Sequence, residues 1–156
     1  TQNCQEREQG FREALSRSSR VKGIYTVNTS TDAELAKQAA IQLLQEHPEI
    51  NVLIGFNEPL AVGTARAVEE LGLAGQVRAI AFDSNVECIE LLQSDVVSAL
   101  IVQNPYAMGY LGVEKAWEAL QGKDFDAESP IDTATLTITK ENLFSMESQK
   151  ALFSFS

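Results

Sequence analysis

The sequence alternates short apolar segments with longer amphipathic segments, and this alternation restricts the folds that the chain can adopt. The short segments are rich in Val and Ile, which is typical of strands in a sheet covered on both faces. In the longer segments, apolar residues recur at the spacing of a helix with one buried face. This pattern predicts an open, doubly wound parallel α/β sheet of about five or six strands, with a Rossmann-like arrangement.

Start and stop signals divide the chain further. Thr31 and Glu34 form a capping-box pattern, which predicts that a helix begins there. Pro59 fits the first turn of the next helix, and Pro105 opens a later helix that reaches Gly122. The expected strands cover residues 21–27, 51–56, 77–82, 97–102 and, half exposed, 131–139.

The chain is acidic, with a formal net charge of −10 and a pI near 4.5. Nucleic acid is therefore not an expected partner, because binding to phosphates depends on clustered Lys and Arg. Cys4 and Cys88 share no metal-binding spacing, and the sequence leaves a disulfide between them open. The sequence has no glycine-rich phosphate loop, and the single histidine, His47, completes no catalytic triad. We expect no cofactor, no metal and no enzymatic activity.

Polar side chains follow three of the expected strands directly. Asn57, Asp83 and Gln103 each come after an apolar run that ends in Phe or Val. In open α/β sheets, ligands bind at the carboxyl ends of the strands. Each residue also precedes an expected helix, so a helix N-cap explains Asn57 and Asp83 equally well when each is taken alone. Gln103 favours the ligand interpretation, since Gln is a poor N-cap.

Asn, Asp and Gln together suit a polyhydroxylated ligand. Their side chains combine donors and acceptors for paired hydroxyl groups, and a carboxylate adds charge-assisted hydrogen bonds. Phe82 is placed to pack on the apolar face of a sugar ring, although a Phe at a strand end is also typical of a core. Arg7 is a further candidate, and pairing with a nearby acidic residue on an exposed helix is the alternative.

Several short motifs occur in the order found in the ribose-binding family of type-1 periplasmic sugar-binding proteins, which the chain resembles over nearly its whole length. The motifs are REQGF at 7–11, QEHPEI at 45–50, GFNEPLAVG at 55–63, AFDS at 81–84, QNPYAMGY at 103–110 and ITKEN at 138–142. By this resemblance, the ligand-binding residues are Arg7, Asn57, Phe82, Asp83 and Gln103. Where the family often has a further aromatic contact, this chain has Thr31, so the resemblance does not single out ribose.

The resemblance also implies an organisation. Family members have two similar lobes joined by hinge crossings, bind a monosaccharide between them and deliver it to a membrane ABC permease. The chain resembles the second, C-terminal lobe, so we expect a truncated fragment of a periplasmic or extracytoplasmic protein. By analogy, residues 1–103 form the ligand-binding lobe, 104–130 a returning segment that packs on the absent first lobe, and 131–156 a final strand and tail. The apolar face of the 105–122 helix then lacks its cover, and we expect that the chain forms a homodimer through it or swaps this helix between copies.

Two other functions fit the same fold. An effector-binding domain of a lac-repressor-type transcription regulator shares this architecture. A hydrolase on a similar sheet would use Asp83 as nucleophile or metal ligand, but it would need a second acidic residue and a lysine at strand ends, which we do not find. The motifs at 103–110 and 138–142 favour the transport protein.

Overall fold

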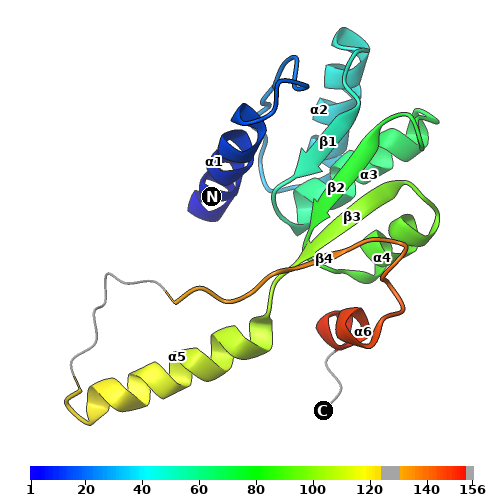
Figure 1. Cartoon of the computed structure of the whole chain (residues 1–156). Helices are drawn as coiled ribbons and strands as arrows, with labels where there is room; N and C mark the ends of the chain where they lie inside the picture. The colour runs from blue at the N-terminus through cyan, green and yellow to red at the C-terminus, as the bar shows by residue number, and fades with distance from the viewer. Residues whose placement is uncertain (124–130, 154–156) are drawn as a thin grey trace.

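The computed structural model of the protein describes residues 1–123 and 131–153. Six helices and four strands follow one another along these residues (Figure 1). The helices are α1 (Gln2–Ser16), α2 (Ala33–Glu46), α3 (Glu58–Glu70), α4 (Val86–Gln93), α5 (Pro105–Leu120) and α6 (Met146–Leu152). The strands are β1 (Val52–Gly55), β2 (Arg78–Phe82), β3 (Val97–Val102) and β4 (Leu136–Ile138).

The strands form one open sheet in the order β1-β2-β3-β4. The pairs β1–β2 and β2–β3 are parallel, whereas β4 runs antiparallel to β3, with Leu100 opposite Ile138. The predicted α/β fold with an open, mainly parallel sheet is confirmed. The described residues contain four strands, fewer than the five or six expected, and the strand expected over 131–139 is limited to the three residues that pair with β3.

One face of the sheet is packed against a helical layer. Helix α3 lies on β1 and β2, α4 lies on β3, and α2 packs against α3. Ala79, Ala81 and Leu100 point into this layer and are almost completely buried. Two glycines permit the close approach: a Cβ on Gly55 would lie 2.3 Å from the backbone N of Ala61, and one on Gly63 would lie 2.4 Å from the carbonyl O of Ala33.

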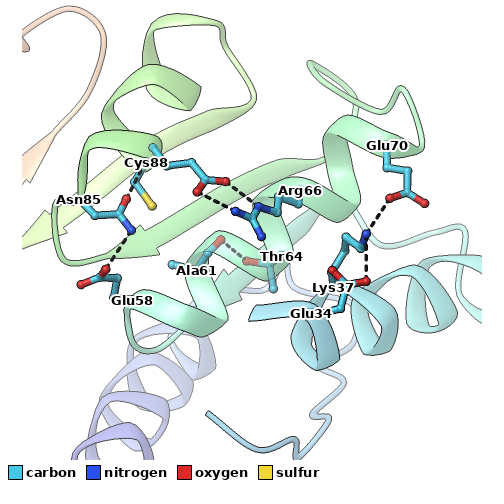
Figure 2. A network of polar contacts seen from close by, with 10 residues as sticks. Glu34, Lys37, Glu58, Ala61, Thr64, Arg66, Glu70, Asn85 and Cys88 are labelled. Carbon is cyan, nitrogen blue, oxygen red and sulfur yellow. Dashed lines mark hydrogen bonds and ion pairs between the residues drawn. The ribbon is translucent and has the colours of Figure 1, made fainter. Parts of the chain in front are cut away.

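Ion pairs join the outer surfaces of the same helices (Figure 2). Arg66 on α3 donates two hydrogen bonds, of 2.6 and 2.8 Å, to the carboxylate of Glu87 on α4. Lys37 on α2 lies 3.1 Å from carboxylate oxygens of both Glu34 and Glu70, and therefore connects α2 with α3. These pairs are partly exposed, so they orient the helices more than they stabilise the fold.

The predicted strand over 21–27 is wrong. Ile24, Tyr25 and Val27 are 38–48% exposed, and the segment forms no ladder with β1 in the described residues. Two of its side chains form hydrogen bonds to neighbouring elements instead: the Tyr25 hydroxyl donates to Glu49 at 2.7 Å, and the Thr26 hydroxyl donates to Glu8 at 2.9 Å. The apolar pattern of residues 21–27 is compatible with a strand at the sheet edge, but it does not determine whether the segment pairs with another strand.

One predicted helix cap is wrong, and the alternative interpretation of Asp83 as a cap is excluded. Asp32, rather than Thr31, caps α2 by accepting a hydrogen bond from the Leu35 backbone at 2.8 Å. Asp83 does not cap α4, because Asn85 does so through the Cys88 backbone N–H at 2.7 Å. In both cases the capping side chain lies closer to the first helical residue, which is where it can reach the free amides.

Helix α5 projects away from the sheet (Figure 1). None of its residues is buried, and its large apolar side chains are exposed: Tyr106 by 78%, Trp117 by 62% and Leu120 by 83%. No helix in the described part of the chain is long and apolar enough to cross a membrane. Cys4 and Cys88 are both free thiols, so the disulfide that the sequence left open is not formed.

Candidate ligand-binding site

Three loop residues that were predicted as ligand contacts lie at one edge of the sheet. Asn57 follows β1 by two residues, and Asp83 and Gln103 directly follow β2 and β3. Because these three strands are parallel neighbours, their carboxyl ends point the same way. The chain therefore brings together side chains that are far apart in sequence, and all three are half-buried.

Asp83 and Gln103 form a direct contact. The Gln103 side-chain amide donates a hydrogen bond to one carboxylate oxygen of Asp83. Asp83 has a φ of 72°, in the left-handed region that few non-glycine residues adopt, and its backbone N–H donates to the Ile101 carbonyl at 3.0 Å. A non-glycine residue in this region is held there by its surroundings and is frequent at ligand sites.

Asn57 has two partners that fix the orientation of its amide. Its Oδ1 accepts a hydrogen bond from the Leu60 backbone N–H at 3.1 Å, so Asn57 is the N-cap of α3, which was the alternative to a ligand contact. Its Nδ2 donates to the sulfur of Cys4 at 3.3 Å. The Asn57 amide keeps one N–H and one lone pair of Oδ1, so it can still donate and accept at the sheet edge.

Arg7 crosses from α1 to the same edge. Its guanidinium donates to the Phe56 carbonyl at 2.7 Å, and its Cζ lies 4.8 Å from the centre of the Phe82 ring. A guanidinium above an aromatic face is attracted by the electrons of the ring. The expected alternative, an exposed Arg7 paired with an acidic neighbour, does not occur in the described residues.

The five predicted residues thus form two adjoining groups. Arg7, Asn57 and Phe82 gather around Phe56 and Cys4, and Asp83 pairs with Gln103. The groups are joined because Phe82 and Asp83 are consecutive. No hydrogen bond links Arg7 or Asn57 directly to Asp83 or Gln103 within the described residues.

The remaining hydrogen-bonding capacity is mixed. Asp83 keeps one carboxylate oxygen, Gln103 keeps its carbonyl oxygen and one N–H, and Arg7 keeps several N–H groups. Beside them the Phe56 and Phe82 rings lie 5.9 Å apart and give an apolar surface. The edge therefore offers donors, acceptors and an aromatic surface to a ligand.

Cys4 and Phe56 were not predicted as site residues. Cys4 lies one helical turn before Arg7, so the spacing could have placed it on the same face of α1. Its thiol lies 3.6 Å from the Phe56 carbonyl, the group that also accepts from Arg7. Phe56 contributes its backbone carbonyl and its ring to the site. Its position directly before Asn57 was the sequence feature that could have identified it.

A hollow of about 920 Å³ lies beside this edge, between α1 with the 18–29 segment and the sheet with α2. Asn57 is the only one of the five predicted residues that lines it. Its walls include Ile54 and Ile80 on the second face of the sheet, which are only half-buried. The hollow is therefore the space that α1 and the unpaired 21–27 segment leave over this face, and the polar residues adjoin it rather than line it.

Comparisons with known proteins identify the family of the chain. A family model described as a periplasmic binding protein domain matches residues 1–124. The D-ribose/D-allose-binding protein of Pseudomonas aeruginosa is 29% identical over 142 residues, which cover 86% of this chain and 44% of that protein. The ribose import binding protein of Escherichia coli is 26% identical over 136 residues, covering 85% of this chain and 44% of its own length.

Solved structures give the same result. An ABC transporter solute-binding protein from Agrobacterium vitis with bound D-fucose has a TM-score of 0.84 and 27% identity, covering 94% of this chain and 50% of that one. A glucose-galactose binding protein from Geobacillus stearothermophilus has a TM-score of 0.83 and 30% identity, covering 90% and 49%. The chain spans about half the length of these relatives. With a family match over most of its residues, a shared lobe fold and polar residues at one sheet edge, the chain belongs to the periplasmic binding protein family.

Proposed function

We propose that the chain is one lobe of the solute-binding component of an ABC-type sugar transporter, and that it binds a monosaccharide or a similar polyhydroxylated solute. The observation that carries the proposal is the common edge formed by Asn57, Asp83 and Gln103, with Arg7 above Phe82. Mixed donors and acceptors beside an aromatic face suit neutral hydroxyl groups. A relative named for ribose and allose, and a solved solute-binding protein with bound D-fucose, support the substrate class.

The proposal includes a second lobe and a partner. Since the chain spans about half of its relatives, the other wall of the cleft belongs to a part of the protein outside this sequence. In a two-lobed receptor, closure removes water from around the ligand and adds further contacts, and a membrane permease recognises the closed form. We infer a periplasmic or extracytoplasmic location, as the names of the import proteins among its relatives support.

The proposal assigns no catalysis to the site. The partner of Asp83 is an amide, Gln103, and not the second acidic residue that a hydrolase would use. His47 lies at the end of α2 before β1, where its Nδ1 is 3.2 Å from Glu49. This places it at the amino ends of the strands, away from the edge that carries Asp83. The transport interpretation is also supported over a lac-repressor-type effector domain by the names of the relatives.

Saturation-transfer NMR on this chain, with D-ribose, D-allose, D-fucose and D-galactose in turn, tests the proposal. We expect weak transfer with at least one sugar, at an affinity of about 1 mM or weaker, because a single lobe supplies only part of the contacts. Asp83→Asn should abolish the transfer, whereas Lys115→Gln on α5 should leave it unchanged. Absence of transfer with all four sugars, or transfer that survives Asp83→Asn, would refute the site. Micromolar affinity by calorimetry would contradict the need for a second lobe.

A further inference from the structure

The thiol of Cys4 lies between two of the residues that the proposed function assigns to the ligand. Its sulfur is 3.3 Å from Nδ2 of Asn57 and 3.6 Å from the backbone carbonyl oxygen of Phe56. The same carbonyl oxygen accepts a hydrogen bond of 2.7 Å from the Arg7 guanidinium. Arg7 belongs to α1 and Asn57 follows β1, so these contacts join two separate elements at the candidate site.

The chemistry of the groups determines the direction of each hydrogen bond. A thiol offers one weak S–H donor and a weakly accepting sulfur. The Phe56 carbonyl has no proton, so the Cys4 thiol donates to it, and the Asn57 NH₂ group can only donate, so the sulfur accepts. The Thr1 hydroxyl also donates to this sulfur, at 3.1 Å. The thiol therefore uses its single proton on the carbonyl that also holds Arg7.

These contacts fix the orientation of the Asn57 amide. Its Oδ1 accepts from the Leu60 backbone N–H at 3.1 Å, and its Nδ2 donates to Cys4. An amide rotated by 180° would place its NH₂ group against the Leu60 N–H, and two donors would then face each other. With both ends of the amide held, one N–H and one oxygen lone pair remain at defined positions for a ligand.

The same contacts determine how α1 sits against the loop after β1. Each residue of α1 is partly or fully exposed, so burial alone does not fix the position of the helix. Cys4 and Arg7 are three residues apart and share one face of the helix, and both bind the Phe56 carbonyl. The Phe11 ring adds an edge contact to the Phe56 ring, with 6.1 Å between the ring centres. The position of Arg7 relative to Asn57 therefore depends on these few contacts.

We propose that Cys4 is a positioning residue of the sugar site, which orients the Asn57 amide and links it to Arg7 through the Phe56 carbonyl. This role rests on the proposed function, in which Arg7 and Asn57 bind the sugar. Hydrogen bonds to a neutral thiol are weak, and the thiol is only half-buried. Loss of the thiol should therefore weaken sugar binding by about three- to fivefold and not abolish it.

Two NMR measurements on Cys4→Ala and Cys4→Ser test the role. In the chain without sugar, Cys4→Ala should speed the exchange of an Asn57 side-chain amide proton with water by about threefold, because that proton loses its acceptor. Cys4→Ser keeps a donor and an acceptor, so it should restore the slower exchange. Titration with whichever of D-ribose, D-allose, D-fucose and D-galactose binds the wild type should give a dissociation constant about three- to fivefold higher for Cys4→Ala. For Cys4→Ser the change should stay below about twofold.

Cys88→Ala is the matched control, since it removes the other thiol by the same substitution. Cys88 is completely buried in α4, and its loss should change neither the Asn57 exchange nor the sugar affinity. Ala is a strong helix former and Cys4 is only half-buried, so Cys4→Ala should fold, which far-UV circular dichroism checks.

Unchanged Asn57 exchange in Cys4→Ala would overturn the proposal. Equal losses of affinity in Cys4→Ala and Cys4→Ser would also overturn it, because the hydrogen bonds would then not be the cause. If the wild type binds one of the sugars and Cys4→Ala binds it equally well, the positioning role fails and the proposed function stands. If the wild type binds none of the four sugars, the proposed function fails and the role in binding fails with it.

Discussion

Gly63→Ala should destabilise the fold, although Ala is the better helix former. Gly63 lies in α3 against α2, where an added Cβ would be 2.4 Å from the Ala33 carbonyl oxygen, 2.6 Å from the Ala36 Cβ and 2.8 Å from the Lys37 backbone N. Two of these atoms belong to backbone, so rotation of a side chain cannot relieve the contact. To reach ordinary separations of about 3.4 Å, α2 must move by nearly 1 Å, which disturbs the buried Ala36.

The magnitude follows from two opposing effects. Overpacking of this severity costs about 3 kcal/mol, and the gain in helix propensity from Gly to Ala returns about 1 kcal/mol. We expect a net loss of about 2 kcal/mol in the free energy of unfolding, which lowers the urea midpoint by about 1 M at a typical slope of about 2 kcal/mol per M. The slope itself should not change, because the surface exposed on unfolding is nearly the same.

Gly10→Ala provides the control by the same chemical change. Gly10 is also helical, in α1, and a Cβ there would meet nothing within 4 Å. Only the propensity effect remains, so Gly10→Ala should stabilise α1 or leave the midpoint unchanged. If Gly63→Ala behaved like Gly10→Ala, the close packing of α2 on α3 would be refuted.

Three further predictions concern single groups. Asp83→Asn should change the free energy of unfolding by less than about 0.5 kcal/mol, since Asn tolerates a positive φ. Asp83→Ala should lower it by about 1–2 kcal/mol. Equal losses for the two variants in urea unfolding would contradict a left-handed Asp83. Glu87→Gln should cost less than about 1 kcal/mol, because its pair with Arg66 is partly exposed, and a loss above 2 kcal/mol would show a buried pair. Burial raises the pKa of the Cys88 thiol to about 11. Between pH 9 and 11 the thiol therefore ionises in the unfolded chain but not in the folded one, and the free energy of unfolding falls as pH rises. A Cys88→Ala variant should show a shallower fall over this range, and equal slopes for the two proteins would count against the burial.

The sheet and its helices were largely predictable because their signals are local. Runs such as 51–56 and 97–102 are mostly apolar and end at the polar residues Asn57 and Gln103, and the structure places β1 and β3 within them. Pro59 lies in the first turn of α3, as its fixed φ and missing N–H predict. The segment 21–27 has an equally apolar pattern, but whether a strand forms there depends on pairing with β1, and periodicity carries no information about a partner.

The candidate site was predictable in position but not in its internal contacts. Residues that follow parallel strands must share one edge, so Asn57, Asp83 and Gln103 could be grouped from the sequence. The contact between Asp83 and Gln103, and the one between Cys4 and Asn57, depend on side-chain conformation across elements that are distant in sequence. The left-handed backbone at Asp83 has no sequence signal of the kind that a glycine gives.

The proposed role of this edge is tested most directly by following the side-chain ¹H–¹⁵N resonances of Arg7, Asn57 and Gln103 while D-ribose or D-allose is added. These groups come from three separate parts of the chain, so a shared ligand must move all three with one apparent dissociation constant. We predict that they shift together, along with the backbone amide of Asp83. Shifts confined to one of the groups, or shifts that instead follow the residues lining the hollow between α1 and α2, would contradict the account.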